Sequence, residues 1–233
     1  MTTTQRREKF RSTFANVPVM MLQGSVGERI KRNFTHQDPP PPLKLAGLYY
    51  TEEGHRGLDT VFHDYVQIAV KYGLAMILHP YTKLTTPSMG FSGDSYNPLT
   101  GLEEEEAYLY YTDHAKMLES SIVDHPPMFY QVNCVHPRNV MSALDKKQNR
   151  TELVRKRFLG LEANGSDMSP EELDNSPVVY SSPADKWAEE MIRLYRDYGL
   201  KLLGGCCGTD HEHMDQLAMR VREVYDERKV SIG

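Results

Sequence analysis

The chain has 233 residues and a formal net charge of -5 at pH 7, with acidic and basic residues mixed along its length. That length suits one large α/β domain or two small ones with a substantial core. The charge balance and the lack of a long basic block disfavour nucleic-acid binding, and no apolar run is long enough to span a membrane.

Residues 1–16 are polar, and we expect them to form an N-terminal arm that is helical in part, ahead of one domain over residues 17–233. The arm lacks the apolar core of a secretory signal. The chain contains three cysteines, Cys134, Cys206 and Cys207. An odd count with an adjacent pair disfavours a disulfide framework and favours a reducing, cytoplasmic setting.

Short apolar runs alternate with helical patterns along the rest of the chain. The run at 17–22 predicts a buried strand, with a turn at Gly24 and Gly27 and a helix from about Glu28. Later strands are predicted at 74–79, 128–134, 157–164 and 200–205, and later helices at 56–72, 102–122, 139–144, 183–198 and 210–228. Gly73 and Gly199 are predicted to end two of these helices. The alternation implies a parallel sheet, either a barrel or an open doubly wound sheet.

All three cysteines fall at the predicted C-terminal ends of strands, where parallel α/β folds place their active sites. Three thiolates with a fourth position open are a ligand set for catalytic zinc, which would hold a substrate thiol as its thiolate. We expect Gly204, Gly205 and Gly208 to let the backbone turn so that two adjacent sulfurs face one ion. The alternative is that the cysteines are buried apolar thiols.

Five segments carry a resemblance to a known family. Motifs of the homocysteine S-methyltransferase family resemble two of them, GGCCGTDHEHM (204–214) and VNCVHP (132–137). Further parts of that family resemble the other three: LQGSVGERIKR (22–32), residues 62–83 and GLEANGS (160–166). The resemblance implies a (β/α)₈ TIM-barrel-like fold and a zinc-dependent enzyme of methionine biosynthesis. Such an enzyme transfers a methyl group from a small-molecule donor to homocysteine sulfur. Sulfonium, betaine, folate and corrinoid donors all occur in the family.

The resemblance also implies roles for individual residues. Cys134, Cys206 and Cys207 match the zinc ligands and catalytic centre. The turn at Gln23, Gly24 and Ser25 matches the one whose backbone amides hold the amino-acid end of homocysteine, and Asn133, beside a ligand, is expected to orient the site. Gln23 stands where the family usually has Asp, so it brings no negative charge to a substrate ammonium.

The middle of the chain departs most from the family. Only 48 residues, 80 to 127, separate His79 from the predicted strand at Met128. The family uses far more chain there, for three strands and a substrate-binding Glu. The acidic run 103–106 could replace that carboxylate, although a solvated helix start is the favoured interpretation. We therefore expect a shortened or incomplete barrel. Because an open sheet edge is costly, we expect a homodimer in which the partner covers it.

Alternatives to methyl transfer to homocysteine remain open at this point. The chain could be a zinc-binding homologue with a binding or regulatory role, or a methyltransferase acting on a different thiol. His211 and His213 could be further metal ligands, but their place in the first turn of the last helix favours a surface role. His136 could support the site or simply belong to the turn before Pro137.

Overall fold

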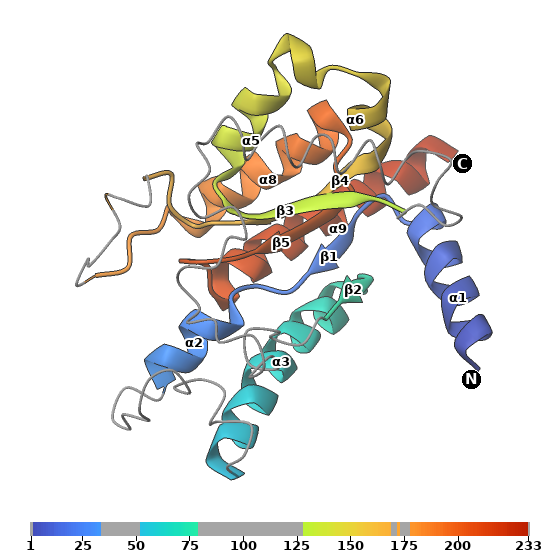
Figure 1. The fold of residues 1–233 in the computed structure, drawn as a ribbon. Helices are drawn as coiled ribbons and strands as arrows, with labels where there is room; N and C mark the ends of the chain where they lie inside the picture. Colours follow the sequence, from blue (N-terminus) through green and yellow to red (C-terminus); the bar gives the residue numbers. More distant parts are fainter. Residues whose placement is uncertain (1, 34–51, 79–127, 169–171, 173–177, 233) are drawn as a thin grey trace.

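The computed structural model describes residues 2–33, 52–78, 128–168, 172 and 178–232. Within these ranges, five parallel strands lie in the spatial order β2-β1-β5-β4-β3 (Figure 1). The strands are β1 (Met20–Leu22), β2 (Met76–Ile77), β3 (Tyr130–Val135), β4 (Phe158–Ala163) and β5 (Leu202–Gly205). The α-helices are α1 (Thr3–Asn16), α2 (Val26–Asn33), α3 (Glu52–Tyr72), α5 (Pro137–Leu144), α6 (Glu152–Arg157), α8 (Ala184–Tyr198) and α9 (His211–Ile232), and a 3₁₀ turn, η4, spans Lys147–Asn149.

The strand order matches that of adjacent strands in a closed parallel β-barrel. The last strand, β5, pairs with the first, β1, which also pairs with β2, while β5 continues through β4 to β3. A (β/α)₈ barrel closes in the same way, with its last strand beside its first. The expected class is confirmed as an α/β fold with a five-stranded parallel sheet, arranged as part of a TIM barrel.

Most predicted elements are present, with shifted ends. β1 and β2 are shorter than the predicted runs at 17–22 and 74–79, and α3 begins at Glu52 rather than at 56. Gly73 and Gly199 end α3 and α8 in the left-handed region, with φ of 62° and 80°. The short helix α6 was not predicted; Thr151 caps it by accepting a hydrogen bond from the Val154 amide. The predicted helix at 102–122, the acidic run 103–106 and His79 lie outside the described residues.

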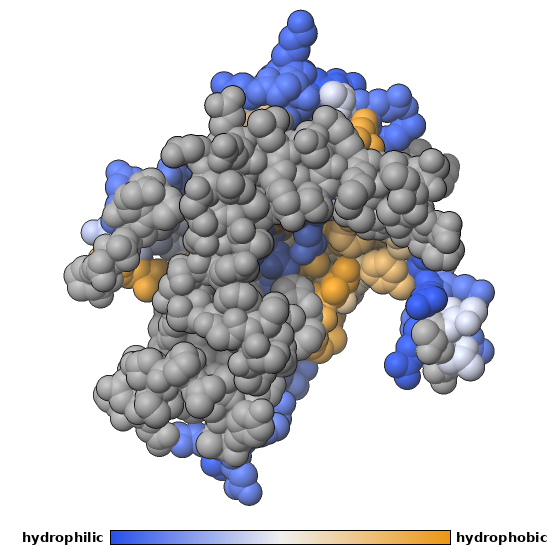
Figure 2. All heavy atoms as spheres, viewed as in Figure 1, coloured by the Kyte–Doolittle hydropathy of each residue, from blue (hydrophilic) through white to orange (hydrophobic). Residues whose placement is uncertain are grey.

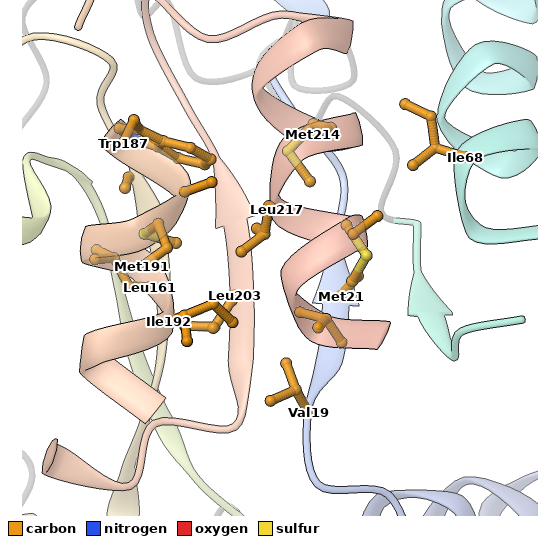
Figure 3. Close-up of a cluster of buried hydrophobic side chains, with 14 of the residues drawn as sticks. Val19, Met21, Ile68, Leu161, Trp187, Met191, Ile192, Leu203, Met214 and Leu217 are labelled. Atoms are coloured by element: carbon orange, nitrogen blue, oxygen red, sulfur yellow. The ribbon is translucent and has the colours of Figure 1, made fainter. Parts of the chain in front are cut away.

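The main core lies between the sheet and the helices α3, α8 and α9 (Figure 3). Alternate residues of the strands point into it, because successive side chains of a strand face opposite sides. Met21, Leu161 and Leu203 come from the sheet, and Trp187 and Met214 come from α8 and α9. All five side chains are fully buried. This layer fixes the two helices that follow β4 and β5, and thus the loops that precede them.

The opposite face of the sheet carries a smaller apolar cluster of Met20, Leu22 and Leu202. Phe10 and Phe14 of α1 pack against it, and Phe14 stacks on Phe129 at a centroid distance of 5.5 Å. The polar N-terminal arm is thus a helix anchored to the sheet by two aromatic side chains. Among the coloured residues of Figure 2, apolar side chains lie near the middle of the view, with polar ones beside them and toward its ends.

Among the described strands, β2 and β3 form the two edges of the sheet. Leu78, Met128 and Val132 lie at these edges and are 36–39% exposed. The homodimer expected from the sequence stays a prediction. A monodisperse monomer in light scattering at micromolar concentration would contradict it. No described helix is both long enough and apolar enough to cross a membrane.

Candidate metal centre

The three cysteines meet at the C-terminal end of the sheet, although their strands are not neighbours. β4 lies between β3, which contains Cys134, and β5, which ends just before Cys206. Backbone hydrogen bonds join the end of β4 to both cysteine-bearing segments. The Cys206 amide donates to Ala163 O at 2.7 Å, and the Asn164 amide donates to Val135 O, next to Cys134, at 3.1 Å. The convergence predicted from the strand ends is therefore present.

The sulfur atoms are close enough to share one ion. Cys134 Sγ lies 2.8 Å from Cys206 Sγ, which lies 4.0 Å from Cys207 Sγ. All three lie within 4.8 Å of one another. A tetrahedral zinc ion with bonds of about 2.3 Å places its sulfur ligands about 3.8 Å apart. Three convergent thiols, two of them exposed, therefore fit a zinc centre that a substrate can reach.

The electrostatics of the cluster favour a cation. Hydrogen bonds with Cys134 and Cys207, together with burial, raise the pKa of the Cys206 thiol far above its ordinary value. Three thiolates so close together repel each other unless a positive charge lies among them. A bound divalent cation reverses this effect, because it stabilises coordinating thiols in their deprotonated form.

Cys134 reaches the cluster through a bulge in β3. Asn133 pairs with Glu162 and Val135 pairs with Ala163, so Cys134 is the extra residue of a bulge in the register. Its φ is 59°, in the left-handed region that residues other than glycine rarely adopt. Such bulges redirect a side chain beside functional sites. Asn133 Nδ2 lies 3.5 Å from Cys134 Sγ, so this predicted site residue contacts a candidate ligand.

The glycines around the cysteine pair have two different roles. Gly208 has φ of 77° and makes the turn that was expected of all three. The expectation was wrong for Gly204 and Gly205, whose φ values are not positive; they are needed where chains approach closely. A Cβ on Gly204 would lie 2.5 Å from Leu22 Cβ and 2.7 Å from Gln23 O, and one on Gly205 would overlap Thr209.

The turn after β1 lies directly beside the cysteine turn. Gln23 O accepts a hydrogen bond from the Gly205 amide at 3.0 Å, and the Ser25 amide donates to Thr209 Oγ1 at 3.4 Å. Tyr65 donates its hydroxyl to Ser25 O at 2.9 Å. Gly24 leaves room for that tyrosine, since a Cβ there would lie 2.7 Å from its hydroxyl. Gln23, Gly24 and Ser25 are thus buried next to the metal centre, and their contact with substrate stays a prediction.

The histidines near the cysteines are not in the cluster. Among the described residues, the group able to hold a metal consists of the three cysteines alone. The surface role expected of His213 was wrong: it is 5% exposed and bonded through both ring nitrogens. His211 is exposed, as expected. His136 caps α5, where its Nδ1 accepts from the Arg138 amide at 3.4 Å, and burial lowers its pKa.

Sequence reasoning missed a buried carboxylate at this end of the sheet. Leu161 and Ala163 point into the core under the helices, so Glu162 between them points to the opposite face. Its register partners are Asn133 on one side and Gly204 on the other, and the residue is 7% exposed. Strand alternation within GLEA could have indicated it, because a charged residue interrupts an otherwise apolar strand.

Comparison with protein families supports the same conclusion. The family model described as homocysteine S-methyltransferase matches residues 112–221, a range that contains all three cysteines. Residues 112–221 therefore carry a homocysteine S-methyltransferase family domain. This is a family of methyltransferases, and the cysteine cluster lies within the part of the chain that its model covers. No curated protein and no solved structure matched the chain.

Proposed function

We propose that the chain is a zinc-dependent methyltransferase that methylates the sulfur of homocysteine to give methionine. The observation that carries this proposal is the convergence of Cys134, Cys206 and Cys207, within a domain of this family. Zinc, when bound, would stabilise the thiolate form of the substrate. The thiol loses its proton to solvent, a new S–CH₃ bond forms, and the bond between methyl and donor breaks with its electron pair left on the donor.

The chain's own residues would bind and orient the amino-acid end of the substrate. Gln23, Gly24 and Ser25 lie within one hydrogen bond of the cysteine turn, which supports their predicted place in the substrate site. The missing charge at Gln23 leaves the substrate ammonium in need of a carboxylate. Glu162 is buried one residue before Ala163, whose carbonyl accepts from the Cys206 amide. We propose that Glu162 supplies that negative charge.

Methyl transfer can be tested directly. The zinc-loaded chain is incubated with homocysteine and, in turn, betaine, S-methylmethionine and S-adenosylmethionine, each with a deuterated methyl group. Labelled methionine is then measured by mass spectrometry. We expect label from one donor in the unmodified chain and none in Cys207→Ala. Homocysteine binding without label from any donor would instead favour a binding or regulatory role, or a folate or corrinoid donor delivered by a separate protein.

The role of Glu162 has a test of its own. Glu162→Gln should weaken homocysteine binding while leaving the binding of 2-mercaptoethanol unchanged, because only homocysteine carries an ammonium group. Calorimetry with the zinc-loaded variant measures both. Equal weakening of the two thiols would show that the substitution disturbs the metal centre, and unchanged homocysteine binding would remove Glu162 from the substrate site.

A further inference from the structure

A chain of hydrogen bonds runs from the second cysteine of the pair to a buried histidine. The Gly165 amide donates to Cys207 O at 2.8 Å, and the Ser182 amide donates to Gly165 O at 2.7 Å. Ser182 O in turn lies 3.0 Å from His213 Nε2. Two loops are joined in this way: the one between β4 and α8, which carries Gly165 and Ser182, and the one between β5 and α9, which carries Cys206 and Cys207.

The histidine closes this chain into a ring. His213 Nδ1 lies 2.8 Å from Asp210 Oδ1, and Asp210 follows Cys207 by only three residues. Asp210 Oδ1 also accepts from the Glu212 and His213 amides, at 3.0 and 3.3 Å, so it is fixed at the start of α9. Cys207 is therefore held from both sides, through the backbone to Asp210 and through hydrogen bonds to His213.

The two ring nitrogens of His213 face different partners, Asp210 at Nδ1 and Ser182 at Nε2. Asp210 Oδ1 and Ser182 O lie 2.8 and 3.0 Å from these nitrogens, so the ring spans the gap between the two loops. Trp187 packs edge-on against the ring at a centroid distance of 5.5 Å, and its indole N–H donates to Asn164 O at 3.0 Å. Packing and hydrogen bonds thus fix the orientation of the imidazole.

Ser181, His213 and Asp210 also have the order of a nucleophilic triad, since Ser181 Oγ lies 2.9 Å from His213 Nε2. The Ser182 carbonyl argues against that role. It is 3.0 Å from the same nitrogen, so Nε2 faces a backbone carbonyl as well as the serine hydroxyl. The arrangement is suited to holding two loops together.

We infer that His213 is a positioning residue for the metal centre, and this inference rests on the proposed function. By joining Ser182 to Asp210, it fixes the segment whose Gly165 amide holds Cys207. It keeps the Cys207 sulfur beside those of Cys134 and Cys206 before any ion binds. Removal of such supporting partners lowers metal affinity by about 10–100-fold.

The test compares variants that keep one of the two hydrogen bonds. His213→Gln can still place an N–H near the Nε2 position, facing Ser182 O, whereas His213→Asn can place one only near Nδ1. Zinc affinity is measured by competition with a chromophoric chelator, and site geometry by the absorption spectrum of the cobalt-loaded chain. We expect about 10–100-fold weaker zinc binding and an altered cobalt spectrum in His213→Ala and His213→Asn. His213→Gln should restore most of the affinity.

His211→Ala is the matched control, because His211 is exposed on the same helical turn. It should leave both zinc affinity and the cobalt spectrum unchanged. Thermal melting of all the apo variants identifies loss of folding, and the Gln and Asn variants keep the test decisive if the Ala variant unfolds. Tight zinc binding by the unmodified chain with equal affinity in His213→Asn and His213→Gln would overturn the positioning role alone. Failure of the unmodified chain to bind zinc would overturn the proposed metal centre itself.

Discussion

The two parts of the metal centre are built in different ways. The Cys206–Cys207 pair follows β5, whose four residues are all buried, and backbone hydrogen bonds hold it to the end of β4. Cys134 lies in β3, which is at the edge of the sheet among the described strands and has four exposed central residues, and a bulge directs it to the cluster. Packing of the core thus fixes the positions of Cys206 and Cys207, whereas the position of Cys134 depends on a local distortion of the backbone.

The cysteine variants give the largest expected effect. Cys207→Ala should lose more zinc affinity than the about 10–100-fold expected for a supporting residue, because a ligand itself is removed. Cys134→Ala should lose zinc to a similar extent. The apo fold should survive in both, since each cysteine is exposed. Metal analysis and circular dichroism measure the two properties, and full zinc content in either variant would remove that cysteine from the site.

Glycine substitutions test how closely β5 packs against β1 at Gly204. Gly204→Ala would place a Cβ 2.5 Å from Leu22 Cβ, and it should lower the free energy of unfolding by about 3 kcal/mol. Gly199→Ala is the matched control: φ is 80° there but nothing lies within 4 Å of the new methyl. It should cost only about 1 kcal/mol of backbone strain. Urea denaturation of the apo chains would show equal costs if the close approach at Gly204 were absent.

Removal of zinc should affect the two parts unequally. The amides of Gly165, Cys206 and Thr209 are hydrogen-bonded within the protein, so chelation should change their hydrogen exchange little. The bulge around Cys134 should lose more protection, because the ion would hold the exposed strand in its unusual conformation. Hydrogen exchange followed by mass spectrometry, with and without a chelator, measures this difference. A uniform change over both segments would contradict the comparison.

A smaller effect is expected from the pH dependence of Asp210. Burial alone would raise the pKa of this carboxyl, but hydrogen bonds from the His213 side chain and amide lower it below its ordinary value. The ionised form therefore stabilises the fold above the unfolded pKa of about 3.9, and this contribution is lost as the pH falls through the lower, folded value. Asp210→Asn should be less stable than the unmodified chain at pH 6, and the difference should shrink as the pH falls below about 4. A difference that persists at pH 2 would show that the carboxylate is not its source.

The sequence predicts this fold and site unevenly, for physical reasons. Helices such as α8, with regular apolar spacing and a terminal glycine, were predicted almost to the residue. The bulge at Cys134 could not be predicted, because it depends on the register between β3 and β4. The role of Gly204 was missed because the residue that approaches it, Leu22 of β1, lies 182 residues earlier in the chain. His213 was placed on the surface because its partner, Ser182, belongs to a different loop.

The central claim is that three cysteines hold one zinc ion with a position open for homocysteine. X-ray absorption at the zinc edge of the loaded chain, recorded before and after homocysteine is added, tests it most directly. We expect three sulfur neighbours before and four after, with no change when homoserine, which lacks the sulfur, is added instead. Fewer than three sulfur neighbours would contradict the metal centre, and three that stay three with homocysteine would contradict the substrate.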